Sequence, residues 1–177
     1  MLKSLENGWN LLVQDESIFI HDSMVKRRKW ITKEKRPMVT VTGSHEKTIV
    51  YGALSLDGSK QLFRQDDKFD SQSFIKYLRQ VKEKFKKFVI FLDRAAQHRS
   101  KMVEEYFHQN MKTMKVEYFP VGSAFLNAVE ECWRQGKGNI LSNYYSSFSQ
   151  VKQAISNYYR KRRFNLDIKK YLFRSTN

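Results

Sequence analysis

The stretch Phe88–Asp93, which reads FVIFLD, decides the fold class of this 177-residue chain. Five consecutive apolar residues between polar ones are typical of a strand that is covered on both faces of a sheet. Helical periodicity precedes and follows this strand. The large apolar residues that show it are Phe74, Leu78, Val81 and Phe85 before the strand and Met102, Val103, Tyr106 and Phe107 after it. A helix, a buried strand and a second helix in this order indicate an α/β protein.

Further strands are predicted on both sides of this unit. Before it, apolar segments predict strands at Leu11–Ile20, Thr48–Leu56 and Lys60–Arg64, and a short β-branched segment predicts an additional strand at Met38–Thr42. The links between these segments are short, so we expect an antiparallel three-strand meander. After it, Val116–Phe119 predicts one more strand. The expected fold is therefore α/β: the meander, then two parallel strands, in one mixed sheet flanked by helices.

Two helices are predicted towards the end of the chain. The first begins at about Ala124, and we expect Gly136 and Gly138 to end or loosen it. The second follows the capping box formed by Ser147 and Gln150. Neither an internal repeat nor a linker divides the sequence, so we expect a single domain over residues 1–177.

The net charge points to a polyanionic partner. Lys and Arg number 33 against 18 Asp and Glu, which gives a formal charge of +15. A small domain needs a charge magnitude of only about 2–8 for solubility, so nucleic acid is the leading candidate partner. The bases cluster in Lys26–Arg36 and Arg160–Arg174, although two solvated surfaces would explain these clusters about as well. The expected DNA-binding residues are Lys26, Arg27, Arg28, Lys29, Arg160, Lys161, Arg162 and Arg163.

Several classes of protein are excluded by the sequence. No apolar run approaches the roughly 20 residues that cross a bilayer, so no membrane partner is expected. Cys132 is the single cysteine, which rules out a disulfide framework and favours a reducing, cytoplasmic, nucleoid-associated location. The four histidines lack the spacing of a zinc site. P-loop and dinucleotide-binding motifs are missing, which excludes those two nucleotide-binding classes.

Two acidic positions on predicted strands stand out in so basic a chain. Asp15 lies in the apolar run of the first strand, where a charged side chain needs a partner. Successive strand residues face opposite sides, so only one of Asp15 and Glu16 is expected to belong to a site. Asp93 follows the FVIFL strand at the carboxyl end, the edge at which open α/β sheets bind ligands. A role for Asp93 as a loop cap explains its position at least as well.

A third carboxylate lies on the predicted helix that begins near Ala124. Glu130 shares a helix face with Asn127 and Arg134, and an ordinary Glu130–Arg134 pair is the alternative interpretation. Two carboxylates on strands and one on a helix, in a basic α/β domain, are what a two-metal phosphoryl-transfer site requires. Mg²⁺ prefers oxygen ligands and needs only a few carboxylates besides the substrate phosphate.

The order of four motifs resembles the catalytic domain of mariner-like transposases, in particular their prokaryotic insertion-sequence relatives with a DDE triad. The segments are Gln14–Ser17, Trp30–Lys33 with Pro37, Asp93–His98 and Leu126–Trp133. They resemble the family's DE(S/T), W-x-x-(K/R)-G, D-N-A-x-x-H and L-N-P-I-E-x-x-W motifs. Between Asp93 and Glu130 lie 36 residues, close to the spacing usual in the family. The sequence departs from the family pattern at Glu34, Arg94, Ala124 and Ala128.

The resemblance implies a ribonuclease-H-like fold and metal-dependent DNA cleavage at transposon ends, followed by strand transfer into target DNA. It makes Asp15, Asp93 and Glu130 the catalytic triad and the ligands of two Mg²⁺ or Mn²⁺ ions. His98 and Asn127 are then supporting residues of the site. Since transposition joins two ends, a homodimer or larger assembly on DNA is expected. The family's N-terminal helix-turn-helix region has no room before the first strand, so either a separate chain supplies end recognition or this chain is a fragment that does not choose its own ends.

Two other functions stay open on the sequence alone. The first is a ribonuclease-H-like nuclease that hydrolyses without transferring strands. The second is a catalytically inactive, DNA-binding remnant of an insertion sequence, whose binding would depend strongly on salt and would need no metal.

Overall fold

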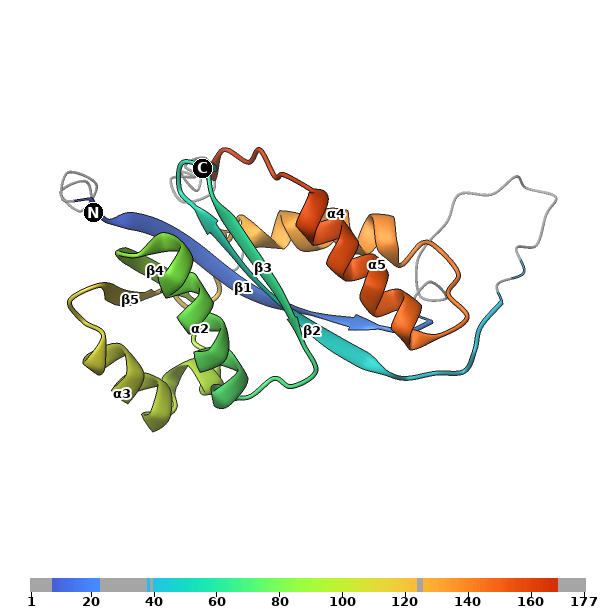
Figure 1. Cartoon of the computed structure of the whole chain (residues 1–177), viewed down its shortest axis with the longest axis horizontal. Coiled ribbons are helices and arrows are strands. Elements are labelled where there is room, and N and C mark those ends of the chain that lie inside the picture. Colours follow the sequence, from blue (N-terminus) through green and yellow to red (C-terminus); the bar gives the residue numbers. More distant parts are fainter. Residues whose placement is uncertain (1–7, 23–37, 39, 124–125, 169–177) are drawn as a thin grey trace.

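The computed structural model describes residues 8–22, 38, 40–123 and 126–168. Its strands form one sheet in the order β3-β2-β1-β4-β5 (Figure 1). They are β1 (Asn10–Ile20), β2 (Lys47–Ser55), β3 (Gln61–Asp66), β4 (Phe88–Leu92) and β5 (Met114–Tyr118). The central strand, β1, pairs antiparallel with β2 and parallel with β4, while β4 pairs parallel with β5. The predicted mixed sheet, a meander followed by two parallel strands, is confirmed.

Helices cover both faces of the sheet. They are α2 (Ser71–Phe85), the 3-10 turn η2 (Ala96–Arg99), α3 (Lys101–Gln109), α4 (Val129–Ile140) and α5 (Phe148–Lys161). Figure 1 shows α2 and α3 on one side of the strands and α4 and α5 on the other. Along β1, Leu12 joins the core under α2 and α3, whereas Leu11 and Val13 join the core under α4 and α5. This alternation means that neighbouring residues of β1 serve different faces.

Local capping explains where α2 begins. The Asp70 carboxylate accepts a hydrogen bond from the Ser73 backbone N–H at 2.8 Å, which satisfies one of the unpaired donors of the first turn. Apolar residues then recur at helical spacing, and Phe74, Leu78 and Val81 are fully buried against the sheet. The predicted capping box of α5 is present in part, because the Ser147 hydroxyl accepts from the Gln150 backbone N–H at 3.4 Å.

Two expectations about secondary structure are wrong. The segment Met38–Thr42 is not a strand: its described residues have no regular structure and are exposed, so they lack a partner strand against which β-branched side chains could pack. The helix expected from Ala124 begins at Val129 and continues through Gly136 and Gly138 to Ile140. Gly136 is needed inside this helix, because a Cβ there would collide with the Tyr159 hydroxyl.

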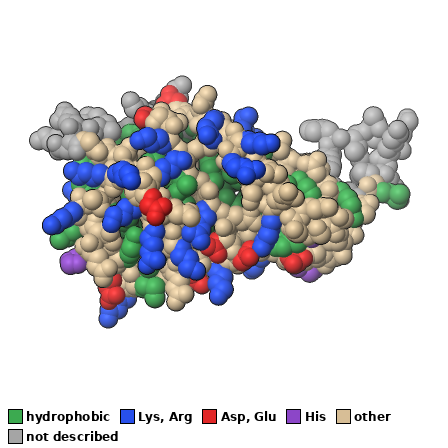
Figure 2. All heavy atoms as spheres, in the orientation of Figure 1, with side chains coloured by type: hydrophobic (Ala, Val, Ile, Leu, Met, Phe, Trp, Pro, Cys, Tyr) green, Lys and Arg blue, Asp and Glu red, His purple; other side chains and the backbone are tan. Residues whose placement is uncertain are grey.

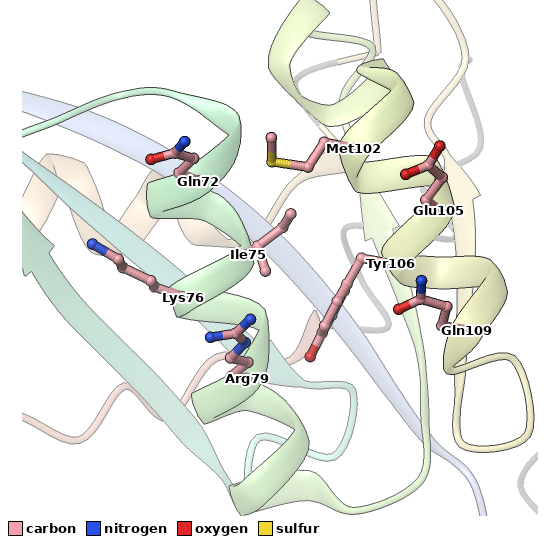
Figure 3. A pocket seen from close by; sticks show the side chains of 8 residues that line it. All are labelled: Gln72, Ile75, Lys76, Arg79, Met102, Glu105, Tyr106 and Gln109. Atoms are coloured by element: carbon pink, nitrogen blue, oxygen red, sulfur yellow. The ribbon is translucent and has the colours of Figure 1, made fainter.

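A cavity of about 380 Å³ lies between α2 and α3 (Figure 3). Ile75 and Arg79 of α2 face Met102 and Tyr106 of α3 across it. It lies on the helical layer opposite α4. Within the described part of the chain, no helix is both long and apolar enough to cross a membrane.

Candidate active site

The register of the sheet brings two of the predicted carboxylates together. Val13 of β1 lies beside Phe91 of β4 in a parallel pair. Asp15 lies two positions beyond Val13 in β1, and Asp93 lies two positions beyond Phe91, directly after the last residue of β4. In a parallel pair, aligned residues project from the same face, and neighbouring strands are about 4.8 Å apart. Both carboxylates therefore meet on the face that α4 covers.

Asp15 lies in an environment that disfavours its charge. Burial raises the pKa of the Asp15 carboxyl from 3.8 to about 7, and the neighbouring carboxylate of Glu130 adds to this shift. The indole Nε1–H of Trp133 opposes it by donating a hydrogen bond to Asp15 Oδ2 at 2.7 Å. Trp133, expected from the sequence to be core, is indeed buried and also orients the Asp15 carboxyl.

Asp93 is held by hydrogen bonds to one of its oxygens. The Ala95 backbone N–H and the His98 ring Nδ1 lie 2.9 Å and 2.8 Å from Asp93 Oδ1. The hydrogen bond from His98 lowers the pKa of the Asp93 carboxyl. Asp93 thus caps the loop after β4, as the alternative interpretation required, and also lines the cavity described below.

Glu130 reaches the same place from the first turn of α4. Asn127 fixes where that helix begins, because its side-chain amide donates to the Gln14 carbonyl at 2.8 Å and its Oδ1 accepts from the Val129 N–H at 3.1 Å. The helix N-terminus also favours negative charge at Glu130. Arg134, the alternative partner considered for Glu130, donates to both oxygens of Glu131.

One cavity of about 260 Å³ brings the three carboxylates together. The residues that line it are Asp15, Asp93, Arg94, Phe119, Pro120, Val121, Gly122, Ser123, Asn127 and Glu130. Three acidic side chains from a strand, a strand end and a helix therefore face one space. Arg94, where the resembling family has Asn, donates from Nε to the Phe119 carbonyl at 3.2 Å and forms part of the wall.

Sequence reasoning missed a fourth carboxylate. Glu16 points to the opposite face from Asp15, as strand geometry requires, yet Glu16 Oε1 lies 2.8 Å from His98 Nε2. His98 therefore bridges Glu16 and Asp93. Burial lowers the pKa of His98, but its bonds to Asp93 and Glu16 outweigh burial and raise it from 6.5 to about 10. The signal in the sequence was the DE pair itself, whose second acid lies in an apolar strand without an obvious partner.

The predicted basic residues are placed in part. Lys26, Arg27, Arg28 and Lys29 lie outside the described residues. Arg160 and Arg163, near the end of α5, line a cavity of about 360 Å³ together with Arg64 and Lys84. Arg162 instead donates to Gln135 Oε1 at 3.1 Å. Lys and Arg side chains spread over the face shown in Figure 2, with fewer acidic ones between them.

A match to a protein-family model shows to which family this chain belongs. Residues 10–152 match the family model described as DDE superfamily endonuclease. The chain belongs to that family. The matched segment of this DDE superfamily endonuclease contains Asp15, Asp93 and Glu130, and the predicted superfamily is confirmed. No curated protein sequence matches the chain.

Solved structures of Mos1 transposase share the fold of this DDE endonuclease domain. The Mos1 catalytic domain with Raltegravir and Mn gives a TM-score of 0.62 at 10% identity, covering 97% of this chain and 82% of that one. The Mos1 paired-end complex with Mg has a TM-score of 0.63 at 13% sequence identity, and the match covers 92% of this chain and 52% of that one. The corresponding complex with Mn has a TM-score of 0.60 at 16% sequence identity, and the match covers 97% of this chain and 54% of that one. This chain thus spans about half the length of the Mos1 chains in paired-end complexes, and the predicted ribonuclease-H-like fold is confirmed.

The donor set of the cavity suits a divalent cation. Among the described residues, no three His, Cys, Asp or Glu side chains already converge as a metal-binding group. Carboxylate oxygens are nevertheless the ligands that Mg²⁺ and Mn²⁺ prefer. Burial raises the pKa of Asp15 to about 7 and the Glu130 carboxylate adds to this shift, so a bound cation would stabilise the ionised form of Asp15.

Proposed function

We propose that this chain is the catalytic domain of a DDE transposase, which cleaves DNA phosphodiesters at the ends of a mobile element and transfers those ends into target DNA. The observation that carries the proposal is the convergence of Asp15, Asp93 and Glu130 on one cavity. Membership of the DDE endonuclease family supports the cleavage step. The fold shared with Mos1 transposase supports the transfer step.

The residues that would hold two Mg²⁺ or Mn²⁺ ions are Asp15, Asp93 and Glu130. The chemistry that bound ions supply is activation of the attacking oxygen and stabilisation of the leaving oxygen. The solved Mos1 structures named above include complexes with Mn and with Mg, which supports this choice of cations.

The protein's own contribution is to place these carboxylates before DNA arrives. Trp133 fixes Asp15 from within the α4 layer, and His98 fixes Asp93 from beneath the sheet. In cleavage, a water oxygen bonds to phosphorus and the 3′ oxygen of the element leaves as a hydroxyl. In transfer, that hydroxyl attacks a target phosphodiester and releases a new 3′ end. Charge develops on phosphate oxygens in both steps, so fixed groups reduce the reorganisation required.

DNA is the proposed partner, and the basic cavity beside α5 is the proposed contact for its backbone. Arg64, Lys84, Arg160 and Arg163 line this cavity, and none of its described lining residues is acidic. Four bases around one space suit phosphate oxygens. Lys161 and Arg162, and the residues at 26–29, complete the proposed DNA-binding set. A homodimer or larger assembly on DNA belongs to the same proposal.

The first experiment is titration calorimetry with Mn²⁺ on the wild type and on Asp93→Asn, since metal binding can be measured without knowing the DNA ends. We expect binding heat in the wild type and its loss in Asp93→Asn, which keeps the side-chain shape. Glu105→Gln, an exposed change on the opposite helical layer, is the matched control. Equal heats for wild type and Asp93→Asn would contradict the proposal and favour an inactive DNA-binding remnant. A cleavage assay that gives hydrolysis products and no joined strands would favour a simple nuclease.

A further inference from the structure

Glu16 is a buried carboxylate that the proposed chemistry does not use. Its side chain is only 6% exposed, and it lies on the α2 and α3 face of β1, away from the cavity that holds Asp15. Burying a carboxylate is strongly unfavourable unless it is paired and hydrogen-bonded. A neutral residue would pack in this core at lower cost. The presence of an acid there therefore requires an explanation.

The contacts of Glu16 lead to the active site. Glu16 Oε1 lies 2.8 Å from His98 Nε2 and also accepts a hydrogen bond from Gln14 Nε2 at 2.9 Å. The other ring nitrogen of His98, Nδ1, lies 2.8 Å from Asp93 Oδ1. Carboxylate oxygens accept hydrogen bonds, so each ring nitrogen of His98 is placed to donate to a carboxylate. Glu16, His98 and Asp93 thus form one continuous chain of charge-assisted hydrogen bonds.

His98 is held so that it cannot turn away. The side chain is fully buried, and the Phe74 ring packs against the imidazole with 4.4 Å between centroids. The Tyr118 hydroxyl donates to the His98 carbonyl at 3.2 Å, which fixes the backbone of η2. Asp93, by contrast, has a side chain that is 53% exposed. An exposed carboxylate rotates readily, so its orientation depends on the rigid group behind it.

We infer that Glu16 is a positioning residue: through His98, it holds the Asp93 carboxylate in the orientation that faces the cavity. An amide at position 16 would offer a different hydrogen-bonding pattern to His98 and would weaken the N–H donor directed at Asp93. The inference rests on the proposed function for its consequence, because the orientation of Asp93 matters only where Asp93 binds a metal.

The first test is the Mn²⁺ affinity of Glu16→Gln in the full chain, measured by calorimetry. Loss of a group that orients a ligand typically weakens metal binding about 10–100-fold, and we expect a change in this range. Glu105→Gln, which removes one charge from the same helical layer without touching His98, should leave the affinity within about twofold. A folded Glu16→Gln protein with wild-type affinity would overturn the inference.

A double-mutant cycle separates positioning through His98 from any direct effect of Glu16. His98→Asn should weaken Mn²⁺ binding by a similar factor, and the double variant should be no weaker than His98→Asn alone. Non-additivity of this kind marks residues that act through one another. Effects that multiply would mean that Glu16 acts independently of His98, which would overturn the inference.

A measurement on the wild type alone keeps the inference testable if a variant fails to fold. In protein labelled with ¹⁵N-histidine, both ring N–H protons of His98 should be visible and protected from exchange, assigned by their absence in His98→Asn. A single ring N–H proton would overturn the inference. If both protons are present but the wild type binds no Mn²⁺, the proposed function fails and the positioning of Asp93 by Glu16 stands.

Discussion

Asp15 and Glu16 are adjacent in the chain, but their side chains lie in different environments on opposite faces of the sheet. Asp15 faces α4, where it meets a second carboxylate, Glu130, beside an open cavity. Glu16 faces α2, where it meets His98 in a closed core. Each has one aromatic-ring donor, Trp133 for Asp15 and His98 for Glu16, at 2.7 Å and 2.8 Å.

The difference separates two uses of a buried acid. On the α4 face three carboxylates line one cavity, with Arg94 as the one basic residue of its described lining, and this excess of acids favours binding of a cation. On the α2 face the negative charge is neutralised by a protonated ring, which is the condition for rigidity. A single strand therefore supplies both a candidate ligand and part of the support for another ligand, because its side chains alternate.

The greatest change is expected from Glu130→Gln. This substitution keeps the shape of the side chain on the α4 face but removes a proposed metal ligand, so DNA cleavage should fall by about a thousandfold. Plasmid nicking in Mn²⁺ measures the effect, and DNA affinity should be retained. Glu131→Gln is the matched control, since Glu131 is the next residue and pairs with Arg134. Equal losses of DNA cleavage in the two variants would contradict the assignment of Glu130, and not Glu131, as a metal ligand.

Asp15→Asn should change how stability depends on pH. The pKa of Asp15 is raised from 3.8 to about 7 in the folded protein, so folding binds a proton across this interval. The contribution is present below pH 4 and is lost as the pH rises towards 7, by on the order of 2–4 kcal/mol in total. Thermal unfolding in EDTA should show this decline in the wild type and a flatter profile in Asp15→Asn. Parallel profiles would show that the α4 face does not crowd charge.

Trp133→Phe should weaken Mn²⁺ binding about 10–100-fold, because it removes the N–H donor to Asp15 and keeps an aromatic ring in the core. Calorimetry measures the change. Trp133 and Glu16 share no hydrogen-bond partner in the described contacts and lie on opposite faces. Their effects should therefore multiply in the double variant. A double variant no weaker than either single one would show that the two faces act as one unit.

The smallest change is expected from Asp70→Ala, which removes the cap of α2. The free energy of unfolding should fall by about 1 kcal/mol, as measured by urea denaturation. Asp70→Asn keeps the capping oxygen and should be nearly neutral. Mn²⁺ affinity should stay unchanged in both, since α2 contributes stability to the layer beneath His98. A large loss of affinity in Asp70→Ala would mean that the rigidity of that layer depends on the end of one helix.

Much of the sheet could be predicted from the sequence, because periodicity records burial. FVIFL is buried on both faces in β4, and the position of Asp93 directly after it follows from the strand's length. Asp15 and Glu130 could be proposed from their unusual positions in the chain. Their convergence depends on the β1–β4 register, which the sequence alone does not specify.

The errors arise where tertiary packing overrides local preference. Gly136 reads as a helix breaker, yet it lies inside α4 because Tyr159 occupies the space of a side chain. Strand alternation excludes Glu16 from the site that contains Asp15, and the two side chains do face opposite sides of the sheet. The expectation that Glu16 has no part in the site is wrong, because η2 places His98 beneath the sheet. There His98 contacts both Glu16 on one face and Asp93, which lines the cavity on the other. No pattern within a single segment records such a return of the chain.

The hydrogen bond between Trp133 and Asp15 joins residues that are 118 positions apart. During synthesis, β1 leaves the ribosome long before α4 does, and a contact of such high sequence separation forms late in folding. A nascent or truncated chain that ends before residue 129 contains neither Glu130 nor Trp133. Under the proposed function, such a chain has no complete set of carboxylates with which to cut DNA. Under the proposed function, the order of the polypeptide delays completion of the metal-binding set until α4 has been synthesised.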